Sequence, residues 1–158
     1  MHVYETKHPV DHTADNMFRL VADVESYPRF LPLCEALKLK RRERRDGKDV
    51  LIATMTVGYK MIRASFTTEV ILDADARTIL VHYLDGPFAF LENRWIFCPI
   101  APESCEIDFY IAYSFRSRLL ERLMGGLFDR AVRKYTDAFE ARADTIYGTR
   151  SRSLASQQ

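Results

Sequence analysis

Residues 105–115 read CEIDFYIAYSF, and this segment alternates between two kinds of side chain. Nearly every odd position holds an apolar or aromatic residue, whereas Glu106, Asp108 and Ser114 stand at even positions. Because successive side chains of a β-strand point to opposite faces, the segment predicts a strand with one covered face and one wet face. Such a strand is typical of an antiparallel sheet that packs on one side only.

Turn signals divide the preceding part of the chain into further strands. Within residues 64–72, ASFTTEVIL, the same alternation places Phe66 and Val70 on one face. Residues 36–115 are therefore predicted to form six strands, and residues 2–9 an additional strand near a sheet edge. The turns are expected at Asp46-Gly47, Gly58, Asp73-Ala74-Asp75, Asp85-Gly86-Pro87 and Pro99 to Glu103.

Two short helices are predicted between the first strand and the second. Thr13 is expected to cap the first helix. Ser26 is expected to cap the second, with Pro28 in its first turn and Pro32 ending it. So short a helix is unstable alone and needs tertiary contacts. We expect these contacts from Tyr27, Phe30, Leu31 and Leu33.

One long amphipathic helix is predicted at the C-terminal end. Apolar residues keep a helical spacing between Ser117 and Tyr147, and Gly148 is a natural stop. Gly125-Gly126 is unusual inside a helix, where two glycines cost about 2 kcal/mol relative to alanine. We interpret the pair as a kink or as space for a ligand or a lid, with a simple helix break as the alternative. Residues 149–158 hold too little apolar area to order themselves, so we expect one domain over residues 1–148 and a flexible tail.

Composition indicates an ordinary globular domain. A chain of 158 residues with 47% hydrophobic residues is the usual size of a single domain with one core. The net charge of +1 argues against a protein that is basic throughout. The three cysteines form no CxxC pair, and strand parity predicts that Cys98 points outward while Cys105 points inward, which argues against a disulfide between them.

Targeting signals are not evident. The N-terminal residues lack an apolar run of signal-peptide length, and no 18 uncharged apolar residues occur in a row. We expect a soluble, cytoplasmic protein, or a mature form whose leader has been removed.

A basic segment, KLKRRERRDGK at residues 38–48, contrasts with the rest of the chain. It holds seven basic and two acidic residues, so its local charge is +5. One interpretation is a sheet edge protected by charge, which is common. The functional interpretations are a contact with an anionic membrane or with ribosomal RNA. Because no aromatic residue for base stacking lies in this segment, we favour lipid slightly. The expected contact residues are Lys40, Arg41, Arg42, Arg44 and Arg45.

Enzymatic chemistry is not indicated by the sequence. The four histidines, His2, His8, His12 and His82, are scattered, and no cluster has metal-ligand spacing. No serine or cysteine lies in a recognisable nucleophile motif. We therefore expect no catalytic residue, no metal and no cofactor.

The predicted α+β architecture favours a ligand cavity. A curved seven-stranded antiparallel sheet wrapped around one helix is hard to close completely. An empty apolar cavity of about 300 Å³ would cost several kcal/mol, so such a tunnel is not expected to persist without a ligand. The candidate wall residues are Phe30, Leu31, Phe66, Phe88, Leu91, Trp95, Phe97, Phe109, Leu123, Leu127 and Phe128, although plain core packing is the commoner role for each alone. Arg63 and Glu92-Asn93-Arg94 are either polar groups near a ligand head or, more commonly, cross-strand pairs on the wet face.

Four segments resemble a known family. The chain is similar to the coenzyme Q-binding proteins and their bacterial relatives described as ribosome-association toxins. These proteins form one branch of the StAR-related lipid-transfer (START)-like, polyketide cyclase-like superfamily. Two departures from the family pattern are Leu33, where tryptophan is usual, and Thr68-Glu69, where serine and a basic residue are common. The segments that carry the resemblance are LVADVESYPRFLPLC at 20–34, Phe66-Thr67-Thr68, GPFAFLENRWIF at 86–97 and AFEARADTIYG at 138–148.

The resemblance implies a fold and a function. The fold is the helix-grip fold of START-like and Bet v 1-like proteins, with the curved sheet around a long C-terminal helix. The implied function is non-catalytic binding of ubiquinone or a related polyisoprenoid lipid in a hydrophobic tunnel, as a chaperone supporting respiratory electron transport and visiting the inner membrane peripherally. The alternative is a toxin that binds the large ribosomal subunit and blocks translation. A cyclase or dehydratase enzyme is a third reading, by analogy alone.

Overall fold

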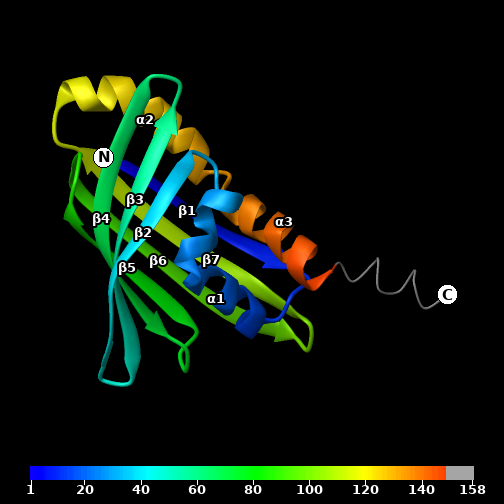
Figure 1. Ribbon diagram of the computed structural model, residues 1–158. Helices are drawn as coiled ribbons and strands as arrows, with labels where there is room; N and C mark the ends of the chain where they lie inside the picture. Colours follow the sequence, from blue (N-terminus) through cyan, green and yellow to red (C-terminus); the bar gives the residue numbers. More distant parts are fainter. Residues whose placement is uncertain (149–158) are drawn as a thin grey trace.

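Seven antiparallel strands form one strongly curved sheet in the computed structural model, which describes residues 1–148 (Figure 1). The predicted tail, residues 149–158, lies outside the described residues. The spatial order is β1-β7-β6-β5-β4-β3-β2, so β1 and β2 are the two edges. The strands are β1 (His2–Val10), β2 (Cys34–Arg45), β3 (Lys48–Tyr59), β4 (Ile62–Asp73), β5 (Thr78–Asp85), β6 (Phe88–Ala101) and β7 (Ser104–Phe115).

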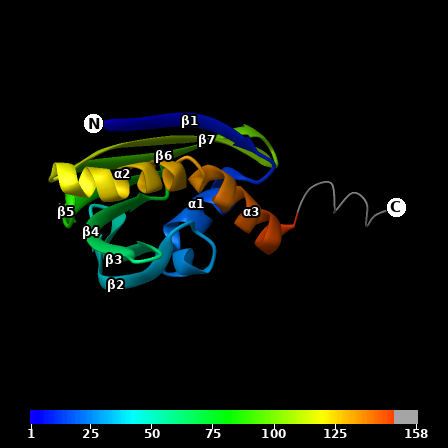
Figure 2. The same cartoon turned by 90° about the horizontal axis from the view of Figure 1, so that it is seen from above.

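The helices lie on the concave side of this sheet (Figure 2). Helix α1 (Ala14–Ala22) and the 3₁₀ helix η1 (Val24–Arg29) follow β1, and α2 (Arg118–Val132) and α3 (Tyr135–Tyr147) follow β7. The sheet therefore grips its C-terminal helices, and the predicted α+β helix-grip architecture is confirmed. No helix within residues 1–148 is long and apolar enough to cross a membrane.

The sequence placed the start of η1 too late. Thr13 caps α1 as predicted, since its hydroxyl accepts a hydrogen bond from the Asn16 amide at 3.1 Å. Ser26, by contrast, lies inside η1, which begins at Val24, and its hydroxyl donates to the Asp23 carboxylate. Val24 is buried, so apolar packing draws the chain into a helical turn before the residue with the better capping chemistry.

The single long C-terminal helix was also a wrong prediction. The chain breaks the helix at Arg133 and Lys134, where the Lys134 amide donates to the Ala131 carbonyl at 3.0 Å. Figure 2 shows that α2 and α3 run in different directions along the sheet. This change of direction lets both helices keep an apolar side on a curved surface. Gly125-Gly126 lies within α2 and does not mark the break.

Strand parity places the cysteines as predicted. Cys105 is fully buried, Cys98 is exposed, and Cys34, at the start of β2, is also buried. None of the three forms a disulfide. Burial raises the pKa of the Cys34 and Cys105 thiols to about 11.

These differences predict selective alkylation. At pH 8 a thiol with a pKa of about 11 is only about 0.1% thiolate, and the thiolate is the nucleophile. We expect iodoacetamide to modify the native protein at Cys98 and to leave Cys34 and Cys105 unmodified, as measured by peptide mass spectrometry. Unfolding in urea should make all three react. Rapid labelling of Cys34 in the folded protein would contradict the packing of the β2 start.

Candidate functional site

An apolar cavity lies between the concave face of the sheet and the helices. Strands β2 to β7 supply most of its wall, η1 contributes Val24 and Tyr27, and the C-terminal helices contribute Phe128, Tyr135 and Phe139. Its volume is about 80 Å³. Its wall is apolar apart from the few polar groups described below.

Five of the predicted wall residues line this cavity. They come from the η1–β2 corner, from β4, from β6 and from α2. Strand parity accounts for the three that lie on β4 and β6, and the fold brings all five to one cavity. They are Leu31, Phe66, Leu91, Trp95 and Phe128.

The other predicted wall residues lie elsewhere. Phe88, Phe97 and Phe109 are completely buried in solid aromatic packing above and below the cavity, with ring centroids of Phe88 and Phe115 4.8 Å apart. Phe30 packs edge-on against Phe139 at 5.1 Å. Two α2 residues point outside the cavity, since Leu127 lines a neighbouring groove and Leu123 is 49% exposed.

The cavity is smaller than the tunnel expected from the sequence. Instead of about 300 Å³ it holds about 80 Å³, at a cost of about 2 kcal/mol if empty. This is room for two or three water molecules at about 30 Å³ each. The small volume is consistent with the expectation that a large apolar tunnel does not persist without a ligand.

A few polar side chains interrupt the apolar wall. Asn93 of β6 accepts a hydrogen bond from the Trp95 indole at 2.9 Å and donates to the Tyr110 carbonyl at 2.8 Å. Tyr27 donates its hydroxyl to the Val21 carbonyl. Burial raises the pKa of the Tyr27 phenol and that of the Tyr135 phenol above the ordinary value for tyrosine, so both phenols remain protonated at neutral pH. Thr68 of β4 also lines the cavity.

Thr68 was not among the predicted wall residues, and Asn93 was considered only as a polar group near a ligand head. Both stand at inward positions by strand parity, and that signal was present in the sequence. The neighbouring polar residues lie on the outer face, where Arg63 pairs with Glu35 at 2.8 Å and Arg94 lies 3.9 Å from Glu5. Of the two interpretations given for these residues, pairing on the outer face applies to Arg63 and Arg94, whereas Asn93 faces the cavity.

Two further hollows lie beside the cavity, on the side of Phe128. A narrow groove between β3 and α2 shares Phe128 with the cavity and includes Met124 and Leu127. An outer groove of about 210 Å³ shares Leu127 and Leu33 with the narrow one and opens beside Tyr59. The Phe128 ring thus stands between the interior cavity and the outside.

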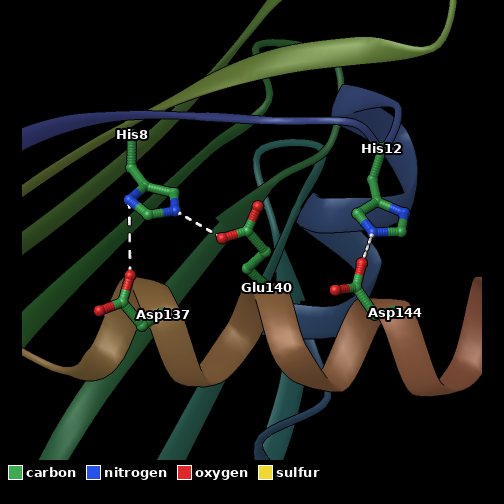
Figure 3. Close-up of polar contacts among 5 residues, drawn as sticks. All are labelled: His8, His12, Asp137, Glu140 and Asp144. Atoms are coloured by element: carbon green, nitrogen blue, oxygen red, sulfur yellow. Dashed lines mark hydrogen bonds and ion pairs between the residues drawn. The ribbon is translucent and has the colours of Figure 1, made fainter. Parts of the chain in front are cut away.

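Helix α3 is held to β1 and to the connection between β1 and α1 by histidine–carboxylate contacts (Figure 3). The His8 Nε2 atom lies 2.9 Å from Glu140 Oε1, and the His12 Nε2 atom lies 2.7 Å from Asp144 Oδ1. His12 is only 5% exposed, so its contact lies within the packed interface. The corresponding contact of α2 is between His2 and Glu121 at its N-terminal turn.

The atoms of His8, Asp137 and Glu140 form the one potential metal-ligating group found within residues 1–148. Asp137 lies 3.8 Å from Nδ1 of His8, whereas Glu140 contacts Nε2, so the two carboxylates address opposite sides of the ring (Figure 3). The arrangement accounts for fixing α3. The residues are 129 positions apart in the sequence, so spacing alone gave no sign of them.

The five predicted basic contact residues lie on the edge strand β2, and all are exposed. Three of them are already paired, because Arg41 and Arg45 contact Glu43 and Arg44 contacts Asp49 at 3.0 Å. Arg42 and Arg44 line a polar crevice of about 340 Å³ against α1, which also contains Arg19. Lys40 has no carboxylate partner among the ion pairs of the described residues.

Comparison with known proteins defines the family. Residues 10–140 match the family described as polyketide cyclase / dehydrase and lipid transport. The chain therefore belongs to that family, and the resemblance drawn from the sequence is confirmed.

Individual relatives carry two different names. The chain is 34% identical over 141 residues to the ribosome association toxin RatA of Escherichia coli strain K12, a match that covers 89% of this chain and 86% of the toxin. It is 30% identical to the mitochondrial coenzyme Q-binding protein COQ10 homolog B of Xenopus laevis over 145 residues, which cover 89% of this chain and 57% of that protein. The solution structure of the 18 kDa protein CC1736 from Caulobacter crescentus has a TM-score of 0.75 and 34% identity, covering 94% of this chain and 100% of that one.

Proposed function

We propose that this protein binds ubiquinone or a related polyisoprenoid lipid in the cavity between the sheet and the C-terminal helices, as a carrier and not as a catalyst. The observation that supports the proposal most strongly is an apolar cavity between sheet and helices that shares Phe128 with a neighbouring groove. The name of the coenzyme Q-binding relative supports the choice of ligand.

The ligand must enlarge the cavity to enter. Burying about 300 Å² of isoprenoid tail at about 25 cal/mol per Å² yields roughly 7 kcal/mol before ordering costs are subtracted. That gain exceeds the cost of displacing one aromatic ring from its packing. Phe128 is the ring to displace, because it belongs to both the cavity and the groove and sits on α2.

Polar groups in the wall favour one orientation of the ligand. A quinone head carries carbonyl oxygens, which accept hydrogen bonds, and Tyr135 is a protonated donor in the wall. Thr68 lines the same cavity and carries a second hydroxyl. We therefore place the head of the ligand toward Tyr135 and Thr68, and its tail toward Phe128 and the groove.

The chemistry of the site supports binding and not catalysis. Neither buried thiol is among the cavity-lining residues, and burial raises the pKa of both, so they are protonated and poor nucleophiles at neutral pH. An acid–base mechanism would use a histidine, and none is among the residues that line the cavity. The histidines of residues 1–148 contact helix carboxylates or lie on the surface.

The test is extraction of the purified protein into organic solvent, followed by mass spectrometry. We expect an isoprenoid quinone at a substantial fraction of one mole per mole of protein. Phe66→Asp, at an 8% exposed wall position, should abolish the signal, whereas Phe90→Asp on the surface of β6 should keep it. Circular dichroism must show that both variants fold. A folded wild-type protein that carries no lipid and binds none from added quinone would refute the proposal.

A second candidate function is binding to the large ribosomal subunit. The name of the 34% identical relative supports it, together with the exposed arginines of the basic segment on β2. Cosedimentation with ribosomes that is lost when Arg41, Arg42, Arg44 and Arg45 are replaced by glutamine would favour this function. Retained cosedimentation of that variant would argue against the basic segment as the contact.

A further inference from the structure

Exposed apolar side chains lie on the two elements that form the groove, the β3–β4 turn and α2. Met61, at the tip of the turn, is 93% exposed, and Tyr59 beside it is 46% exposed. On α2, Leu119 is 62% exposed and Leu123 is 49% exposed. Large apolar residues rarely gather at one surface without a partner. We call these four residues and the cations named below the groove rim.

The α2 leucines lie on the side of the helix that faces the groove. Leu119, Leu123 and Leu127 are spaced by four residues, so they form one stripe along the helix. Leu127 lies in both grooves, next to Ile62 in one and Tyr59 in the other. The opposite flank of α2 faces β1, where Glu121 contacts His2 and Arg133 stacks over the Tyr4 ring at 4.9 Å. The leucine stripe is therefore directed toward the opening.

Unpaired positive charge surrounds the apolar residues. Lys60, Arg122, Arg130 and Lys134 are exposed. Within residues 1–148, none of these four forms an ion pair, whereas most of the arginines of the β2 edge are paired. Arg130 and Lys134 line the outer groove itself. In a chain of net charge +1, this is a local concentration of free cations around an apolar centre.

We infer that the groove rim docks onto an anionic lipid bilayer, with Met61, Leu119 and Leu123 entering the interface and Lys60, Arg122, Arg130 and Lys134 contacting the headgroups. Apolar residues surrounded by basic ones match an interface whose surface is negative and whose interior is hydrocarbon. A second copy of this chain fits less well, because two identical rims would bring like charges together.

This contact lies far from the basic segment that the sequence indicated. The β2–β3 turn and the β3–β4 turn are at opposite ends of β3, and its 12 residues span about 40 Å. Figure 1 shows the two turns at opposite ends of the hairpin, with α2 beside the β3–β4 turn. The rim surrounds the groove that leads to Phe128, so a docked protein presents its opening to the bilayer. The docking is independent of the ligand, whereas its use for lipid entry rests on the proposed function.

Sedimentation with vesicles tests the docking. We expect the full chain to bind phosphatidylcholine vesicles that contain phosphatidylglycerol and to bind pure phosphatidylcholine vesicles weakly. Combined replacement Arg122→Gln, Arg130→Gln and Lys134→Gln should lower the partition coefficient at least about tenfold, since each cation contributes about fivefold. Met61→Ser with Leu123→Ser should lower it as well. The matched control, Arg41→Gln, Arg42→Gln and Arg44→Gln on β2, should keep most of the binding.

Each other outcome has a definite meaning. Wild-type protein that ignores anionic vesicles, or binding that is lost only in the β2 control, would overturn the inference. A dimer in light scattering that Leu123→Ser dissociates would assign the rim to a second copy instead. If vesicle binding follows the rim but solvent extraction finds no lipid, the docking stands and the proposed carrier function fails. Because all the replaced residues are exposed, unchanged circular dichroism confirms the fold of each variant.

Discussion

The Ala53→Leu variant is expected to lose its lipid and to become more stable. Ala53 lies on β3, is 3% exposed, and lines the cavity of about 80 Å³. The replacement adds three carbon atoms to this space, and filling it recovers up to about 2 kcal/mol of unfolding free energy. A ligand would then have to displace the new side chain too. We expect the lipid content, measured by mass spectrometry of the extract, to fall at least about tenfold, while the urea midpoint rises.

A matched control separates the site from the substitution. Ala141→Leu makes the same change at an exposed position of α3 and should leave both lipid content and stability unchanged. Overpacking would show as a lower urea midpoint, and the smaller Ala53→Val then tests the same cavity with less strain. A stable Ala53→Leu protein that retains its lipid would place the ligand somewhere else.

The Phe139→Ala variant is expected to lose about 3–5 kcal/mol of unfolding free energy, a large part of the 5–15 typical of a domain. Phe139 of α3 is completely buried, and its ring lies 5.3 Å from Tyr27, 5.1 Å from Phe30 and 5.2 Å from Trp95. It joins η1, β6 and α3 in one aromatic cluster. It also borders the existing cavity, so its loss would enlarge a space that the neighbours already fail to fill. Urea denaturation followed by tryptophan fluorescence measures the change.

The comparison for this prediction is another phenylalanine of the sheet. Phe90 of β6 is 39% exposed, so Phe90→Ala should cost less than about 1 kcal/mol. Equal losses for the two variants would mean that α3 does not pack on the sheet as the structure shows.

Local chemistry was enough to predict the strands, and the resemblance to a known family implied the helix-grip fold. Alternation in β7 assigned Cys105 and Cys98 to opposite faces, and Thr13 marked the start of α1, because both signals act within a few residues. The break at Arg133 and Lys134 could not be predicted in this way. Neither residue disfavours a helix, and the apolar stripe continues from Ala131 to Tyr135 without interruption. The curvature of the sheet, which is a long-range property, decides where the helix must turn.

The sequence predicted which side chains point to the concave face of the sheet, but not which of them line the cavity. Parity correctly turned Phe66, Phe88 and Trp95 toward the concave side, yet it does not tell which of them reach a cavity. That depends on how neighbouring rings fill the space, as Phe115 and Phe128 do around Phe88. The fixing of α3 by His8 and His12 depends equally on contacts between residues distant in the sequence.

The interruption between α2 and α3 divides the C-terminal region into two parts with different sensitivities. Helix α3 contacts His8 of β1 and His12 of the connection between β1 and α1, so we expect its residues to govern the melting temperature. Helix α2 carries Phe128 and the leucine stripe, so under the proposed function we expect its residues to govern how long a bound lipid stays. We therefore expect substitutions in α2 to change the residence time of a bound lipid, and substitutions in α3 to change the melting temperature.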